Sequence, residues 1–148
     1  MKRLLKLGLF SSGIVVITLV IAAGFLTTMA ATSGGIEVTL TGKEEVPPVK
    51  TAATGKGTIV VSSDKSVSGS ITTSGIEGSA AHIHDGARGK NCPVIVPLTK
   101  TSADTWTVPT GSKLTDAQYE SYEAGNLYVN VHSAEHKGGE IRGQLSPK

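Results

Sequence analysis

All four histidines of the chain fall in two short segments, and imidazole is a common ligand of transition metals. His82 and His84 occur in Ala-His-Ile-His-Asp, and His132 and His136 occur in Val-His-Ser-Ala-Glu-His. Residues two apart in a strand point to the same face, so His82 and His84 should project together. If the second segment is a neighbouring strand, three imidazoles converge on one spot. The sequence therefore predicts a metal centre of His82, His84 and His132, with an open coordination position.

The same alternation separates a core face from an outer face. Within residues 127–132, one face carries aliphatic side chains and the other carries Tyr128, Asn130 and His132. The aliphatic face, together with Ile83, is expected to pack in the core. The histidines are then expected on the outer face of the sheet.

Two further residues are candidate ligands because of their position near these segments. His136 follows the second strand in a loop before two glycines, and is either a fourth ligand or a solvated residue. Cys92 lies eight residues after His84, and its thiolate could reach the same site. As the single cysteine, it excludes a disulfide within the chain, and its plainest interpretation is a small, partly buried side chain.

Polar residues around the histidines are candidates to orient an imidazole or to add a donor. These are Asp85, Asn130 and Glu135. Arg142 could attract an anion, or it could form a surface ion pair with Glu140 on the same strand face. The charged residues 43–45 are expected to be solvated.

The N-terminus reads as an export signal. Residues 1–6 carry Lys2, Arg3 and Lys6, an apolar run follows over residues 7–26, and small residues end the segment. This order predicts either a signal peptide cut after Ala30 or an uncleaved membrane anchor, and both place the remainder outside the cytoplasm. Without the leader the charge is close to neutral, which argues against nucleic-acid binding.

The rest of the chain is predicted to be all-β. We expect residues 1–31 to be the signal or anchor, 32–35 a linker, and 36–148 one domain. Within that domain the strands are expected at 36–40, 57–62, 67–73, 80–84, 94–96, 105–108, 127–132 and 140–145. One helix is expected over 114–125, with Thr115 as N-cap and Gln118 as its capping partner. The fold predicted is an antiparallel Greek-key β-sandwich of about eight strands with one short helix.

Four stretches in this order resemble the chordin-type (CHRD) domain. They are residues 40–49, residues 81–86, residues 114–118, and residues 127–132 running on to 139–145. The resemblance implies an extracellular β-sandwich module. The chain departs from the usual pattern at Cys92, where Gly is common, and at His136, where Asn is common. Both departures add candidate ligands near the histidines.

A fainter resemblance concerns the metal. The His82–Asp85 stretch is similar to the copper-binding strand of copper/zinc superoxide dismutases, and Val131-His132 is similar to their later copper histidine. The chain has no counterpart of the zinc-ligand loop, the bridging histidine or the disulfide pair. The resemblance therefore implies a copper-only arrangement.

Three functions follow from these observations. The first is an extracytoplasmic metal-binding protein, with copper favoured because an all-imidazole site suits it and because copper heads the affinity order. The second is a cell-surface interaction module that binds a protein partner and has structural histidines. The third is a copper-dependent oxidoreductase of the superoxide dismutase type. Contact with a membrane is expected only through residues 7–26, if they are not cleaved.

Overall fold

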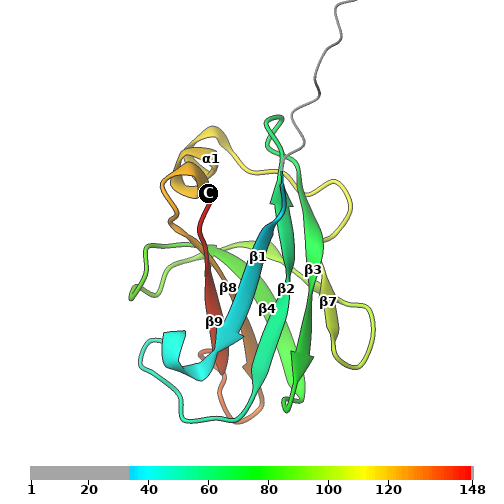
Figure 1. The fold of residues 1–148 in the computed structure, drawn as a ribbon, viewed down its shortest axis with the longest axis vertical. Coiled ribbons are helices and arrows are strands. Elements are labelled where there is room, and N and C mark those ends of the chain that lie inside the picture. Colours follow the sequence, from blue (N-terminus) through cyan, green and yellow to red (C-terminus); the bar gives the residue numbers. More distant parts are fainter. Residues whose placement is uncertain (1–33, 148) are drawn as a thin grey trace, which may run out of the picture. The chain divides into compact units, whose positions relative to one another are not determined.

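The computed structural model describes residues 34–147, which form nine strands and one α-helix (Figure 1). The strands are β1 (Ile36–Thr41), β2 (Thr54–Val61), β3 (Val67–Ser74), β4 (Gly78–Asp85), β5 (Val94–Pro97), β6 (Thr99–Lys100), β7 (Thr105–Thr107), β8 (Leu127–Ser133) and β9 (Ile141–Leu145). A 3₁₀ turn, η1 (Gly42–Glu44), follows β1, and the helix α1 (Asp116–Glu123) precedes β8. The predicted leader at 1–31 lies outside the described residues. Within residues 34–147, no helix is both long and apolar enough to cross a membrane.

All nine strands pair antiparallel in one sheet, in the order β5-β4-β8-β9-β1-β2-β3-β7-β6. The two end strands, β5 and β6, are consecutive in the chain, and between them the Leu98 N–H donates to the Ala81 carbonyl of β4. The sheet therefore curves back on itself towards a barrel. The predicted all-β class is confirmed, and so are the eight expected strands. The strand that sequence analysis missed, β6, is only two residues long and is too short to show a period.

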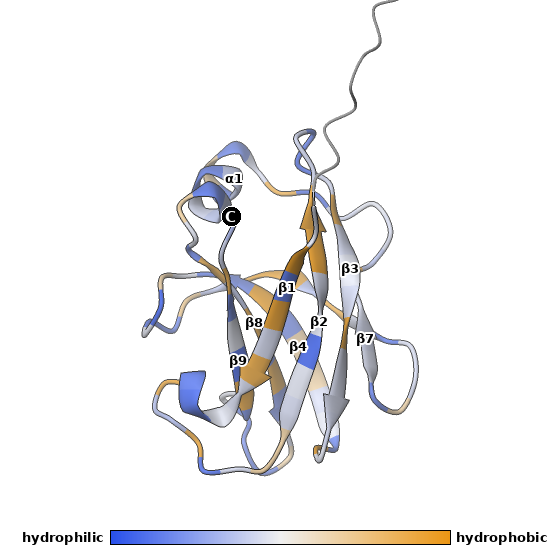
Figure 2. Cartoon of the chain, in the orientation of Figure 1, coloured by the Kyte–Doolittle hydropathy of each residue, from blue (hydrophilic) through white to orange (hydrophobic). Residues whose placement is uncertain are grey.

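The core lies on the inner face of this curved sheet, and hydrophobic segments alternate with polar ones along β1 (Figure 2). Ile83, Leu127, Val129 and Val131 are each no more than 1% exposed, as expected. Fixing these side chains inward also fixes their neighbours outward, because the side-chain period of a strand is two. The buried aliphatic residues of β4 and β8 therefore determine which way the histidines point.

The helix forms where its capping signals predict it. The Thr115 hydroxyl accepts from the Gln118 N–H, and the Gln118 side chain accepts from the Thr115 N–H. This reciprocal pair satisfies two of the free N–H groups at the helix start. Helix α1 then leads into β8, the strand that carries His132.

Two loops cover the outer face of β4, β8 and β9, which differs from the open outer face that the strand pattern suggests. One is the segment 42–49 and the other is the segment 86–93. An Arg88–Glu44 ion pair joins them, and the Asn91 side-chain amide donates to the Val46 carbonyl at 2.7 Å. Under these loops, outward-facing side chains of β8 and β9 are buried. The outer face here therefore forms a second, polar interior.

Candidate metal centre

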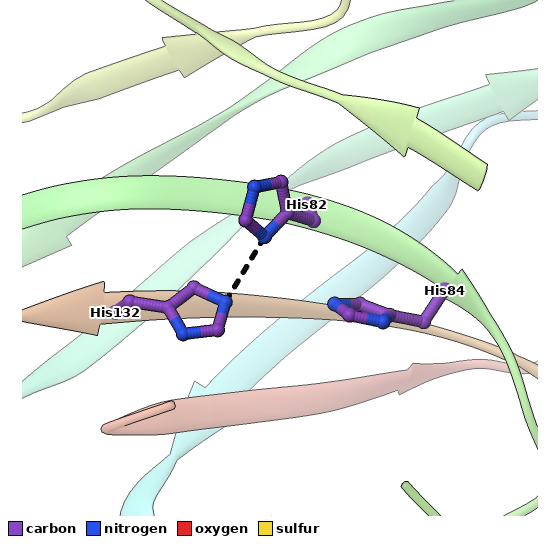
Figure 3. Close-up of side chains that lie close together, drawn as sticks. All are labelled: His82, His84 and His132. Atoms are coloured by element: carbon purple, nitrogen blue, oxygen red, sulfur yellow. Dashed lines mark hydrogen bonds between the residues drawn. The ribbon is translucent and has the colours of Figure 1, made fainter. Parts of the chain in front are cut away.

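Three histidines from two neighbouring strands meet above β4 and β8. Figure 3 shows His82 and His84 on β4 and His132 on β8, with the His84 ring extending towards His132. The strands pair antiparallel, with His82 opposite Asn130 and Ala80 opposite His132. His82 and His132 are thus diagonal neighbours on one face, within reach of long side chains. The predicted convergence of the three imidazoles is confirmed.

The ring nitrogens lie at distances that a metal ion can bridge. Nδ1 of His82 is 3.0 Å from Nε2 of His132, and one nitrogen of each histidine lies within 4.8 Å of the others. Two donors about 2.0–2.1 Å from one ion, at about a right angle, are about 2.9 Å apart. Donors on opposite sides of such an ion are about 4.1 Å apart, so nitrogens at the 4.8 Å limit need to move together by about 0.7 Å to share one ion.

Backbone carbonyls orient two of the three rings. Nδ1 of His84 lies 2.8 Å from the Cys92 carbonyl oxygen, and Nδ1 of His132 lies 2.9 Å from the Lys137 carbonyl oxygen. A carbonyl only accepts, so each Nδ1 carries a hydrogen and donates it. In the neutral ring Nε2 then keeps its lone pair. The Nε2 atom of His132 lies beside Nδ1 of His82, and the Nε2 atom of His84 lies beside Oδ1 of Asn130. This is the tautomer that metal-binding histidines adopt when a second partner holds the far nitrogen.

The surroundings keep two of the imidazoles neutral. Burial lowers the pKa of His82 below its usual 6.5, and the nearby His132 and His84 rings lower it further. Burial also lowers the pKa of His84, with help from His132 and Arg142 and against the hydrogen bonds to Cys92 and Asn130. A neutral imidazole is the form that binds a metal ion. His82 and His84 are therefore held, at neutral pH, in the form that can coordinate a cation.

His84 is the most enclosed of the three. Its side chain stacks on the Tyr128 ring, with centroids 4.6 Å apart and an interplanar angle of 1°. Tyr128 is 2% exposed and also contacts Arg142, whose guanidinium lies 3.4 Å from the ring centroid. This stack spans β4, β8 and β9, and it fixes the plane of the His84 ring.

Arg142 differs most from its expected surface position. It is 1% exposed and forms no ion pair with a carboxylate among residues 34–147. Its guanidinium instead donates to the Ala87 carbonyl at 3.3 Å and lies 3.4 Å from the Asn91 side-chain oxygen. Glu140, its expected partner, accepts from the Thr51 hydroxyl at 2.7 Å. The surface ion-pair interpretation was wrong because the 86–93 loop covers this part of β9.

The other predicted ligands do not join the group. Within the described part of the chain, only His82, His84 and His132 bring donor atoms of His, Cys, Asp or Glu side chains close enough to share one ion. His136 lies in the β8–β9 turn, where its backbone bonds to Ser133 and Gly139. Cys92 serves through its carbonyl, while its sulfur packs against Gly86. The turn and the loop direct these two side chains elsewhere.

Of the residues predicted to orient an imidazole, some lie at the histidine group and others do not. Asn130 is 3% exposed, and its Oδ1 lies 2.9 Å from Nε2 of His84. Asp85 follows His84 and so points to the opposite face of β4, while Glu135 is exposed in the β8–β9 turn. Of these three, only Asn130 contacts a histidine of the group.

Two residues at the site were given no role there by the sequence analysis. Glu45 was expected in solvent but is 4% exposed, although it belongs to the 42–49 loop. Nothing in the local sequence predicts this, because the Glu45 carboxylate lies against Gly139, a residue far along the chain. Period two did place Tyr128 on the same face as the histidines. Its burial and its stacking on His84 were not predicted, because the strand pattern does not show that a loop covers this face.

The comparisons with known proteins identify one family. The pattern of the CHRD domain matches residues 36–145, which include every strand of the sheet and all three clustered histidines. The search of curated proteins and the search of solved structures each gave no match. Because the family pattern covers most of the chain, this protein belongs to the CHRD domain family.

Proposed function

We propose that this protein is an extracytoplasmic metal-binding protein of the CHRD family, and that copper is its metal. The ligands are His82, His84 and His132. The observation that carries the proposal is the clustering of the three rings together with the orientation of His84 and His132, whose Nδ1–H groups are held by backbone carbonyls, so that each Nε2 keeps a lone pair for an ion. Histidines that happened to lie near one another on the surface would not be expected to share this orientation. The family match supports the location outside the cytoplasm.

Copper is favoured by the donor set. All three donors are imidazoles, which suit copper, zinc, iron and nickel, and copper binds most tightly of the divalent first-row ions. His82 and His132 are only half-buried, so the group is in contact with solvent. Such a site can capture and deliver copper, or it can support redox chemistry on a small oxygen species, for which a bound copper ion would supply the electron transfer. The superoxide dismutase reaction is one example of such redox chemistry, and it stays a prediction.

A second candidate function rests on a specific observation at His84. Both of its nitrogens already contact oxygen atoms, those of Cys92 and Asn130, and its side chain is only 7% exposed. A structural histidine in a surface interaction module would have the same features. The two functions differ in the role of His82. Among the described residues its side chain bonds only to His132, so it matters chiefly if the group binds an ion.

The proposal predicts that copper is bound at pH 7 and released as the pH falls. Because the pKa values of His82 and His84 lie below 6.5, both rings stay neutral through that pH and take up protons only below it. Protons then compete with the metal. Titration of copper into the purified protein, prepared without a histidine tag, should give one equivalent at pH 7 and little retention at pH 5. Retention that is equal at both pH values would contradict imidazole ligation.

The same shifts give the sign of the effect on folding without metal. The unfolded chain takes up protons on these histidines near 6.5, while the folded chain resists until a lower pH. The contribution of these neutral histidines to the free energy of unfolding is therefore complete above pH 6.5 and is lost as the pH falls below it. Urea unfolding of the copper-free protein should show a lower midpoint at pH 5 than at pH 7.

A further inference from the structure

A buried carboxylate lies next to Asn130, one contact removed from the histidines. Glu45 and Asn130 are 4% and 3% exposed, and both reach the backbone of Gly139. A methyl group at Gly139 would overlap Glu45 Oε1 and would lie 2.7 Å from the Asn130 amide nitrogen. Glu45 Oε1 is a buried atom without a hydrogen bond of ordinary geometry. A buried, incompletely satisfied carboxylate is costly, so its position beside a candidate metal centre needs an explanation.

The contacts of His84 show a conflict that a cation would resolve. A neutral imidazole has one N–H, and His84 uses it on the Cys92 carbonyl. Its Nε2 lone pair then faces Asn130 Oδ1 at 2.9 Å, which places two acceptors against each other. A metal ion between them turns the repulsion into two favourable contacts, because both lone pairs point at the same positive charge.

Glu45 explains why the Asn130 amide does not simply turn over. Turning it over would direct the amide nitrogen to His84 and the oxygen to the Glu45 carboxylate. With the amide as it stands, its nitrogen is on the side of Glu45, since the Asn130 nitrogen and Glu45 Oε1 both lie within 2.7 Å of the same point beside Gly139. The carboxylate therefore selects the amide orientation that directs oxygen to the histidines.

We propose that Asn130 Oδ1 is a fourth donor of the metal centre and that Glu45 is the positioning residue that holds it there. This inference rests on the proposed copper site and adds an oxygen to its three nitrogens. The 2.9 Å between Oδ1 and His84 Nε2 is the separation of two donors about 2.0–2.1 Å from one ion and at about a right angle. An amide oxygen backed by a negative charge suits a harder ion. The pair Glu45–Asn130 therefore favours Cu(II) over Cu(I).

The test compares Glu45→Gln with a matched control. Glu45→Gln keeps the shape of the side chain and removes its charge. Glu140→Gln makes the same change at another buried glutamate, 8% exposed, whose carboxylate bonds to Thr51 rather than to Asn130. Competition with chelators should show Cu(II) affinity reduced about tenfold or more in Glu45→Gln, as is usual for residues that orient ligands, and unchanged in Glu140→Gln. Cu(I) affinity should change less.

A second variant and a spectrum separate positioning from a general structural effect. Asn130→Ala should weaken Cu(II) binding at least as much, and adding Glu45→Gln to it should cause no further loss, because Glu45 acts only through Asn130. The electron paramagnetic resonance spectrum of bound Cu(II) should shift in both single variants away from three nitrogens and one oxygen. Urea unfolding of each variant confirms that the folded protein is being compared.

The outcomes distinguish this inference from the proposed function. If the unsubstituted protein takes up no copper, both fail together. If it binds copper but Glu45→Gln matches Glu140→Gln in Cu(II) affinity and spectrum, the copper site stands and the role of Glu45 is rejected. The role of Glu45 would also be rejected if adding Glu45→Gln to Asn130→Ala lowered the Cu(II) affinity as much as Glu45→Gln does alone, since Glu45 would then act without Asn130.

Discussion

Replacing His82 by alanine should remove most of the copper affinity and leave the fold intact. The variant loses one of three imidazoles, so we expect Cu(II) to bind about 100-fold more weakly or worse, since even the loss of a residue that only orients a ligand costs about 10–100-fold. His82 is half-buried, and its side chain bonds only to His132. The free energy of unfolding should therefore change by less than about 1 kcal/mol. Chelator competition and urea unfolding measure the two quantities separately.

The matched control for this substitution is His136→Ala. It removes a histidine of the same segment, whose side chain lies outside the group that could share one ion. Its copper affinity should equal that of the unsubstituted protein. If both alanine variants lost copper equally, the ligand set would have to include the β8–β9 turn. If neither lost copper, the ion would bind elsewhere, and the histidines would be structural.

The largest expected effect on stability comes from Tyr128. Its ring is 2% exposed between His84 and the guanidinium of Arg142. Removing a buried aromatic ring typically costs about 3–5 kcal/mol, and here it also leaves a buried cation without its aromatic partner. Tyr128→Ala should therefore lower the free energy of unfolding by about 3–5 kcal/mol in urea titrations.

The phenylalanine variant separates the ring from its hydroxyl. Tyr128→Phe keeps the stack and loses only the contact in which the Cys92 N–H donates to the Tyr128 oxygen at 3.2 Å. One hydrogen bond contributes about 0.5–1.5 kcal/mol, so a small loss is expected. A loss in Tyr128→Phe as large as in Tyr128→Ala would show that the hydroxyl, and not the stack, holds the 86–93 loop in place.

The parts of the site that could be predicted are those governed by local periodicity. Alternation along residues 80–84 and 127–132 gave the inward position of Ile83 and Val131, and with it the shared face of His82, His84 and His132. The helix before β8 was also predictable, because Thr115 and Gln118 form a capping pair within one turn. In each case the residues that decide the structure are close together in the sequence.

The remaining parts depend on contacts between distant segments. Two loops, joined by the Arg88–Glu44 ion pair, fold over the outer face. Arg142 is buried beneath the 86–93 loop, and Glu45 is buried because its own loop brings its carboxylate against Gly139. Loop paths follow from many weak interactions, and no period reveals them. For the same reason Cys92 contributes its carbonyl rather than its sulfur, which its side-chain chemistry could not indicate.

The most direct test of the account is to count the imidazoles around one bound copper ion. Purified, untagged protein loaded with one equivalent of Cu(II) at pH 7 would be studied by pulsed electron paramagnetic resonance, which detects the remote nitrogen of each coordinated ring. We predict one copper ion per chain, coordinated by three imidazoles in the unsubstituted protein and by two in His82→Ala. Copper bound by one imidazole or none, or a spectrum that His82→Ala leaves unchanged, would contradict it.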